Sequence, residues 1–200
     1  MTEVGLRERK KQATRRRITT EAVQLFSARG IEAVTVDEIA AAAEVGKGTV
    51  YNYFAAKEDI IVSFLLDLDR AALAAMPGIA DVAASPAEAL DEAAWSLMAN
   101  KEAHRPFVRA FLGRLVSGEG FAHELGAFQT VLDDALTAFF ERLIARFGLA
   151  PERSIVELNL SFKTQHLGLS TLWSLEGPPF ATTRMLTAWH MDMFAKGLGR

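Results

Sequence analysis

The chain has 200 residues, half of them apolar, with 22 lysines and arginines against 25 aspartates and glutamates and no cysteine. This length and apolar content suffice for a folded core and exclude a disordered chain. The absence of cysteine excludes disulfides, thiolate zinc sites and cysteine nucleophiles. Residues 1–17 are charged, and no apolar run approaches the ~20 residues of a membrane span. We therefore expect no secretory signal, no contact with a membrane and a cytoplasmic location.

The net charge of −3 is unevenly distributed along the chain. Residues 1–57 hold ten basic and seven acidic residues, whereas residues 58–200 are net acidic. Seven of the basic residues lie between positions 7 and 17, where Glu8 is the single acid. Such a run is either a solvated helix face or an electrostatic footprint for nucleic acid. The second interpretation requires a nearby structural element that can contact the bases of the nucleic acid.

Apolar residues recur at spacings of three and four along nearly the whole chain, which predicts an all-α fold of about nine helices. The first helix is expected from about Lys11 to Arg29, with Gly30 as its C-terminal cap. The second begins at Thr35, because Thr35 and Glu38 have the spacing of a capping box. The remaining helices are expected over residues 47–54, 57–75, from 86 onward, 106–117, 121–147, 151–176 and 182–197.

Three of these boundaries depend on particular residues. Pro77, followed by Gly78, is expected to end the fourth helix. Ser85 at the N-cap and Pro86 at the first helical position open the fifth. Thr182 or Thr183 is expected to cap the ninth.

Residues 35–54 have the composition of a helix-turn-helix. Four alanines, at positions 40–43, let two short helices cross closely, and Ile39, Val45, Val50 and Phe54 supply the apolar contact between them. The outward side of the second helix is then left with hydroxyls, an amide, one cation and no acid. These are the groups that contact phosphates and base edges. They belong to Lys47, Thr49, Tyr51, Asn52 and Tyr53.

With this segment, the first sixty or so residues resemble the DNA-binding domain of the TetR family of transcriptional regulators. The residues that carry the resemblance are Phe26, Gly30, Thr35, Ile39, Ala40, Val45, Gly48, Thr49, Tyr51, Tyr53, Phe54 and Lys57. Two positions depart from the family pattern: Glu44 stands where glycine is usual, and Gly46 where serine is frequent. A residue other than glycine in a left-handed turn costs ~1 kcal/mol.

The resemblance implies a role for each matched residue. Base contacts in the major groove are implied for Lys47, Thr49 and Tyr51, with Asn52 as a possible addition, whereas Tyr51 could instead pack against the first helix. Phosphate contacts are implied for Thr35, Tyr53, Lys57 and the amide of Gly48. The basic segment of residues 7–17, called the basic arm below, would add phosphate or minor-groove contacts, notably from Arg15, Arg16 and Arg17.

The resemblance also implies a DNA-binding domain in residues 1–57 and a helical ligand-binding and dimerisation domain in residues 58–200. The last two expected helices are apolar on more than one side, which independently favours a homodimer. The interface residues expected on them are Leu160, Leu167, Gly168, Trp189 and Met193. A pocket for a small, largely apolar ligand would be lined by Trp95, Met98, Phe107, Phe111, Phe128, Phe162, His166 and Trp173. An ordinary core would use most of the same aromatic residues.

Phosphate-loop, dinucleotide, nucleophile-elbow and zinc-protease motifs are missing from the sequence, so we expect no enzymatic activity. The histidines lack the spacing of metal ligands, and we expect no metal and no other cofactor. The sequence therefore predicts a repressor that binds a palindrome in double-stranded DNA as a homodimer and is released by a small molecule. The alternative is a DNA-binding protein whose C-terminal domain responds to a protein partner or to no ligand.

Overall fold

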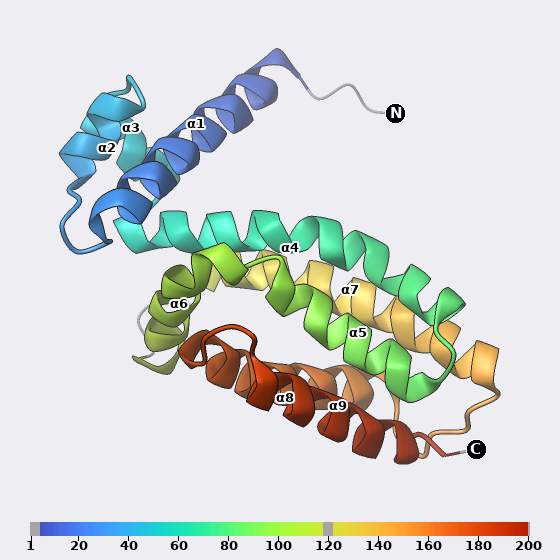
Figure 1. The fold of residues 1–200 in the computed structure, drawn as a ribbon. Coiled ribbons are helices and arrows are strands. Elements are labelled where there is room, and N and C mark those ends of the chain that lie inside the picture. The colour runs from blue at the N-terminus through green and yellow to red at the C-terminus, as the bar shows by residue number, and fades with distance from the viewer. Residues whose placement is uncertain (1–4, 118–121, 200) are drawn as a thin grey trace. The chain divides into compact units, whose positions relative to one another are not determined.

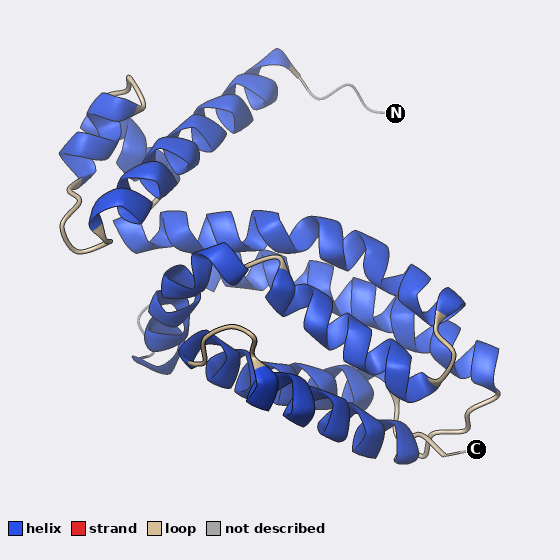
Figure 2. Ribbon diagram, viewed as in Figure 1, coloured by secondary structure: helices blue, strands red, loops and turns tan. Residues whose placement is uncertain are grey.

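The structure, a computed structural model, describes residues 5–117 and 122–199. These residues form nine α-helices, one short 3₁₀ helix and no strand, so the predicted all-α fold is confirmed (Figure 2). The helices are α1 (Leu6–Arg29), α2 (Val36–Ala42), α3 (Lys47–Tyr53), α4 (Lys57–Val82), α5 (Pro86–Ala99), η1 (Glu102–His104), α6 (Arg105–Ser117), α7 (Ala122–Phe147), α8 (Ile155–Leu175) and α9 (Ala181–Lys196) (Figure 1). Phe121, the expected first residue of α7, lies outside the described residues.

The chain divides into two compact units that meet between Leu65 and Leu66, inside α4. The boundary predicted from the sequence lies at residue 57, where α4 begins. Within the described residues, none of the helices combines the length and apolar character needed to cross a membrane.

The first unit contains α1, α2, α3 and the beginning of α4. Ile18, Ala22 and Phe26 of α1 are buried in its core together with Ile39 of α2 and Val50 of α3. α1 begins at Leu6, five residues before the predicted start. The basic arm is therefore itself helical, since arginine, lysine and glutamine are good helix formers.

The second unit is a bundle formed by the rest of α4 and by α5 to α9. α5 packs against α9, and both α6 and α7 pack against α8 (Figure 1). Its core is rich in aromatic rings: Phe140 of α7 lies edge-on to Phe162 of α8, with ring centroids 6.3 Å apart, and edge-on to Phe194 of α9, at 5.9 Å.

The prediction that Pro77 ends the fourth helix is wrong, because α4 continues to Val82. The buried stripe of Leu73 and Met76 extends past the proline to Ala80, so continuing the helix buries more apolar surface. Arg146 of α7 donates to the carbonyl oxygens of Ala80 (3.0 Å) and Ala83 (2.8 Å), which satisfies acceptors at the helix end.

α8 begins at Ile155 rather than at Pro151 as predicted. Ser154 and Glu157 form a capping box, in which the amide of Glu157 donates to Ser154 Oγ (3.3 Å) and Glu157 Oε2 accepts from the amide of Ser154 (2.9 Å). The spacing of these two residues is visible in the sequence, and it is a stronger start signal than the proline.

α9 is not capped by its own threonines, contrary to the prediction. Its N-cap residue is Phe180, which has a left-handed backbone and no side-chain cap. The carboxylate of Glu176 instead accepts hydrogen bonds from the amides of Thr182 and Thr183, both at 2.8 Å, and from the Thr183 hydroxyl. These bonds, chiefly that from the Thr183 hydroxyl, lower the pKa of Glu176 from 4.5 to about 2.

We expect Glu176→Gln to lower the melting temperature near neutral pH, because the amide nitrogen of glutamine would face an N–H donor. A carboxyl group whose pKa is lowered by folding stabilises the protein only while it is ionised. The difference from the wild type should therefore persist above pH 4.5 and shrink as the pH falls towards 2. Thermal unfolding followed by circular dichroism measures it. Glu152→Gln, at an exposed position, is the control, and equal pH profiles for the two variants would contradict the assignment.

Candidate nucleic-acid interface

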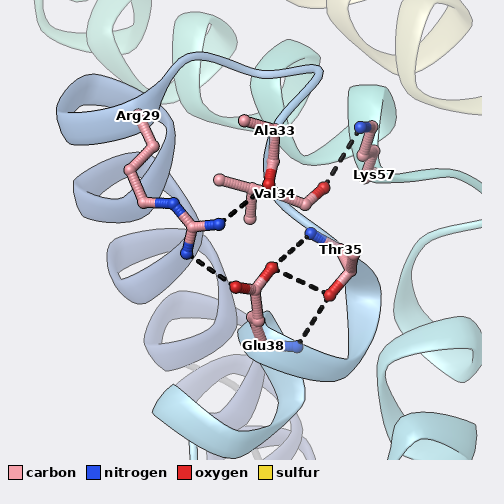
Figure 3. Close-up of polar contacts among 6 residues, drawn as sticks. All are labelled: Arg29, Ala33, Val34, Thr35, Glu38 and Lys57. Carbon is pink, nitrogen blue, oxygen red and sulfur yellow. Dashed lines mark hydrogen bonds and ion pairs between the residues drawn. The ribbon is translucent and has the colours of Figure 1, made fainter.

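The start of α2 is held by the predicted capping box (Figure 3). Glu38 donates its amide to Thr35 Oγ1 (3.3 Å), and Glu38 Oε2 accepts from the amide (2.8 Å) and the hydroxyl (2.9 Å) of Thr35. Glu38 Oε1 lies 2.6 Å from the guanidinium of Arg29, which also donates to the carbonyl oxygen of Ala33 (2.9 Å). Chiefly through the bond from the Thr35 amide, these contacts lower the pKa of Glu38 to about 2. One carboxylate thus joins the end of α1 to the start of α2.

Lys57 is bound to the loop between α1 and α2. Its ammonium donates to the carbonyl oxygens of Ile31 (2.8 Å), Val34 (3.1 Å) and Glu32 (3.4 Å). Figure 3 shows the bond to Val34 beside the capping box. A phosphate would have to compete with these three carbonyls for the ammonium, so the phosphate contact implied for Lys57 stays a prediction.

The turn between α2 and α3 has a left-handed residue at Glu44, with φ of 50°. Its amide donates to the carbonyl oxygen of Ala41 (3.1 Å), and the next amide, that of Val45, donates to Ala40 (2.9 Å). These bonds reverse the chain between the two helices. The family's usual glycine at position 44 therefore corresponds to a backbone conformation that is strained for glutamate.

α3 is the second helix of the predicted helix-turn-helix and is called the reading helix below, because its outward residues are those expected to contact bases. Its Val50 is buried, and so is Phe54 directly after it. Of the outward residues predicted to contact DNA, Lys47, Gly48, Tyr51 and Asn52 are exposed, whereas Thr49 and Tyr53 are half-buried. The side chain of Tyr51 is 50% exposed, which favours an outward orientation over packing against α1. Thr35 lies in the capping box, where its hydroxyl is engaged with Glu38.

Asp37 is a member of this surface that the sequence analysis missed. Its Oδ2 lies 2.8 Å from Nζ of Lys47, and both side chains are more than half exposed. The hydrogen bond to Asp37 raises the pKa of Lys47. The pair joins two different helices, so helical periodicity within either helix could not reveal it.

The three arginines predicted to contact DNA from the basic arm have different surroundings. The guanidinium of Arg15 lies over the ring of Phe54, 4.9 Å from its centroid, and donates to Ser63 Oγ (3.1 Å). Arg15 therefore packs within the first unit. Arg16 and Arg17 are exposed, and Arg17 is 3.9 Å from the Glu44 carboxylate.

In the second unit, the residues predicted to line a pocket differ in burial. Met98, Phe107, Phe162 and Trp173 are buried, and Trp95, Phe111, Phe128 and His166 are half-buried. The His166 ring stacks on Phe162 at 6.1 Å and contacts the Ser170 hydroxyl through Nε2 (3.1 Å). Nδ1 of His166 and Nε1 of Trp173 are buried and have no hydrogen-bond partner among the residues described.

A polar cluster that the sequence analysis missed lies in the same unit. Nζ of Lys101 donates to both carboxylate oxygens of Asp69, at 2.6 and 2.8 Å, and both side chains are buried. Burial raises the pKa of Asp69. Burial, together with the charge of Lys101, lowers the pKa of His166 to about 3, so its imidazole is neutral.

The residues predicted for the dimer interface are exposed in the single chain. Leu160 and Trp189 are 62% and 55% exposed, and Leu167, Gly168 and Met193 are exposed as well. Further large apolar side chains are exposed on the same two helices, namely Val156, Leu175 and Met185. The spacing of four from 156 to 160 and from 185 through 189 to 193 places each series on one side of its helix.

Comparison with known proteins relates the first unit to one family. Residues 18–63 match the model of the bacterial regulatory proteins of the tetR family. The HTH-type transcriptional regulator TcmR of Streptomyces glaucescens is 36% identical over 115 residues, which cover 58% of this chain and 44% of that protein. The chain thus matches less than half the length of this curated relative.

Several solved structures share the fold over nearly the whole chain. The FadR repressor of Thermus thermophilus, in complex with lauroyl-CoA, superposes with a TM-score of 0.74 at 19% identity and covers 92% of this chain and 94% of its own. Salmonella enterica GusR gives 0.66 at 19% identity, with 93% and 95% covered. Bacillus subtilis FadR in complex with stearoyl-CoA gives 0.65 at 16% identity, with 90% and 97% covered. At these identities the likeness establishes the fold.

We expect Glu44→Gly to raise the free energy of unfolding by up to about 1 kcal/mol, because glycine relieves the left-handed strain and loses part of that gain through a more flexible unfolded chain. Glu44→Ala removes the same carboxylate and keeps the Cβ atom, so it should not stabilise the protein. Urea unfolding measures both variants. Equal stability of the two would show that the backbone at Glu44 is not strained.

We expect Lys57→Met to lower the free energy of unfolding by about 1–2 kcal/mol, because the loop carbonyls lose a charged donor. Lys47→Met, which breaks an exposed ion pair, should change it by less than about 0.5 kcal/mol. Chemical denaturation tests this expectation, and binding to random duplex is measured in parallel. Weaker DNA binding by Lys57→Met at unchanged stability would instead assign Lys57 to phosphate contact.

Proposed function

The chain belongs, by its N-terminal domain, to the TetR family of bacterial regulatory proteins, and we propose that it represses transcription by binding a palindromic operator as a homodimer. A small, largely apolar ligand would release it from DNA. The matching family and the curated relative are regulators of transcription and not enzymes, in agreement with the absence of catalytic motifs from the sequence.

The observation that carries the proposed homodimer is the exposed apolar surface of α8 and α9. Large apolar side chains, among them Leu160, Leu175, Met185 and Trp189, face solvent in the single chain. Each Å² of apolar surface that is removed from water contributes roughly 25 cal/mol of favourable free energy, so binding of a second copy over this surface is favoured. A twofold dimer also presents two reading helices to two half-sites, which a palindrome requires.

The interior of the second unit supports a small-molecule effector. Its buried side chains are mainly aliphatic but include the rings of Phe140, Phe162 and Trp173. Two buried ring nitrogens without a partner in the described chain, Nδ1 of His166 and Nε1 of Trp173, would gain hydrogen bonds from a ligand. Two proteins of the same fold have lauroyl-CoA and stearoyl-CoA in their solved complexes. We therefore propose an apolar ligand with a few hydrogen-bonding groups and take acyl-CoA thioesters as the first class to test.

α4 would couple ligand binding in the second unit to DNA binding in the first. It is one helix from Lys57 to Val82, so it crosses the boundary between the two compact units. At its first residue, the ammonium of Lys57 is bonded to the loop that precedes α2. A ligand that displaced α4 would change the position of that loop and hence the spacing of the two reading helices, which should match ~34 Å or a multiple of it.

We expect selection of bound DNA from a random library to return a palindrome, and sedimentation to find a dimer. Trp189→Asp should yield a monomer, because the proposed contact would bury an unpaired charge, and it should lose at least about tenfold in operator affinity. Val82→Asp introduces the same charge at another exposed apolar position, outside α8 and α9, and serves as the control. A monomeric wild type that binds a single half-site would contradict the proposal.

The ligand part has its own test. Fluorescence anisotropy of the labelled operator is followed while lauroyl-CoA, lipophilic cations, steroids or flavonoids are added, and release by at least one class is expected. Failure of every class to release DNA would favour the alternative in which the C-terminal domain responds to a protein partner or to no ligand.

A further inference from the structure

The ion pair of Lys47 and Asp37 has a geometry that matches one kind of base pair. Nζ of Lys47 and Oδ2 of Asp37 are 2.8 Å apart, and their side chains are 52% and 67% exposed. A donor and an acceptor are therefore held side by side at the start of the reading helix. This inference rests on the proposed function, because it concerns which bases the α2–α3 surface contacts.

The ion pairs nearby have other partners or a poorer geometry. Arg29 and Glu38 are engaged elsewhere: Glu38 accepts from Thr35 in the capping box, and Arg29 donates to Glu38 and to the carbonyl oxygen of Ala33. Arg17 and Glu44 are 3.9 Å apart, beyond the range of a hydrogen bond. Lys47 and Asp37, by contrast, make a hydrogen bond and remain open to solvent.

The edge of a G·C pair in the major groove is the complement of this arrangement. Guanine presents the acceptors O6 and N7, and the N4 amino donor of cytosine lies directly beside O6. We propose that Lys47 and Asp37 act together to read one G·C base pair in each half-site. Lys47 donates to guanine O6 and N7, and Asp37 accepts from cytosine N4.

The same arrangement discriminates against the other three base pairs. A·T and C·G both place an amino donor where Lys47 meets O6 and an oxygen acceptor where Asp37 accepts, so these two contacts become repulsive. A·T keeps only the N7 acceptor for Lys47, and C·G has no acceptor at that place. T·A offers O4 and N6 in the right order, but the thymine methyl group occupies the place of the second acceptor. The expected order of preference is G·C, then T·A, then the remaining two pairs.

Asp37 also explains how a flexible lysine could read a base. A lysine ammonium is a compact charge that binds phosphate without regard to sequence. With Asp37 attached, the pair is neutral as a whole, and a nearby phosphate repels the carboxylate as it attracts the ammonium. The pair is stabilised where both partners are satisfied, which a base-pair edge provides and a phosphate does not.

The test is selection of bound DNA from a random library with four proteins: the wild type, Asp37→Ala, Asp37→Asn and Asp67→Ala. Asp67→Ala is the matched control, since it removes the same charge from another exposed ion pair of 2.8 Å, with Arg70. We expect the wild type to select G·C at one position of each half-site. Asp37→Ala should lose about tenfold in discrimination between G·C and C·G at that position and keep its other preferences. Asp37→Asn keeps an acceptor oxygen and should retain part of the preference, and Asp67→Ala should match the wild type.

Two outcomes would overturn the inference. If Asp37→Ala tightens binding to all sequences alike and keeps the wild-type preference, Asp37 is only a negative charge near DNA, while the proposed function stands. If the wild type selects no sequence, the inference and the proposed function fail together. Thermal unfolding of each variant confirms that it is folded, as expected for a substitution at a mostly exposed side chain.

Discussion

The placement of the reading helix depends on the carboxylate of Glu38. α2 and α3 have seven residues each, too few for either helix to be stable by itself. Their orientation must therefore come from contacts, and for α2 Glu38 supplies polar ones by bonding to Thr35 on one side and to Arg29 on the other. Both oxygens accept from fixed donors, so α2 has a defined start and a defined direction relative to α1. The positions of Asp37 and of the helix that follows the turn are consequences of this anchoring.

The loop between α1 and α2 is held by a second set of bonds, because the ammonium of Lys57 donates to its carbonyl oxygens. A lysine that satisfies several carbonyl oxygens fixes a segment that has no regular secondary structure. These bonds also attach the first turn of α4 to the loop that precedes α2, within the first unit. α4 then continues without a break through Pro77, where the loss of one backbone hydrogen bond is offset by buried apolar contacts and by Arg146 at the far end.

Local signals were predictable from the sequence, and signals from distant residues were not. The capping box of Thr35 lies within four neighbouring residues, so spacing and residue type were sufficient to locate it. The left-handed turn at Glu44 was implied only by the glycine that is usual at this position in the family that the segment resembles. The end of α4 depends on Arg146, and the cap of α9 on Glu176 across a loop, and neither follows from periodicity. For the site, the outward residues of α3 followed from the buried positions. The partners of Arg15, Lys47 and Lys57 did not, since each side chain crosses to another helix or loop.

The proposed homodimer changes what a single ion pair can contribute. In a twofold complex the two reading helices meet symmetric half-sites, so a preference at one position is expressed twice. If mismatches at separate positions are roughly additive in free energy, a tenfold discrimination in each half-site becomes about a hundredfold discrimination for the operator. This gain depends on the apolar surface of α8 and α9, because a monomer would express it once. Specificity for DNA would then depend on both units: the Lys47–Asp37 pair, which selects a base pair, and the C-terminal helices, which determine how many times that base pair is contacted.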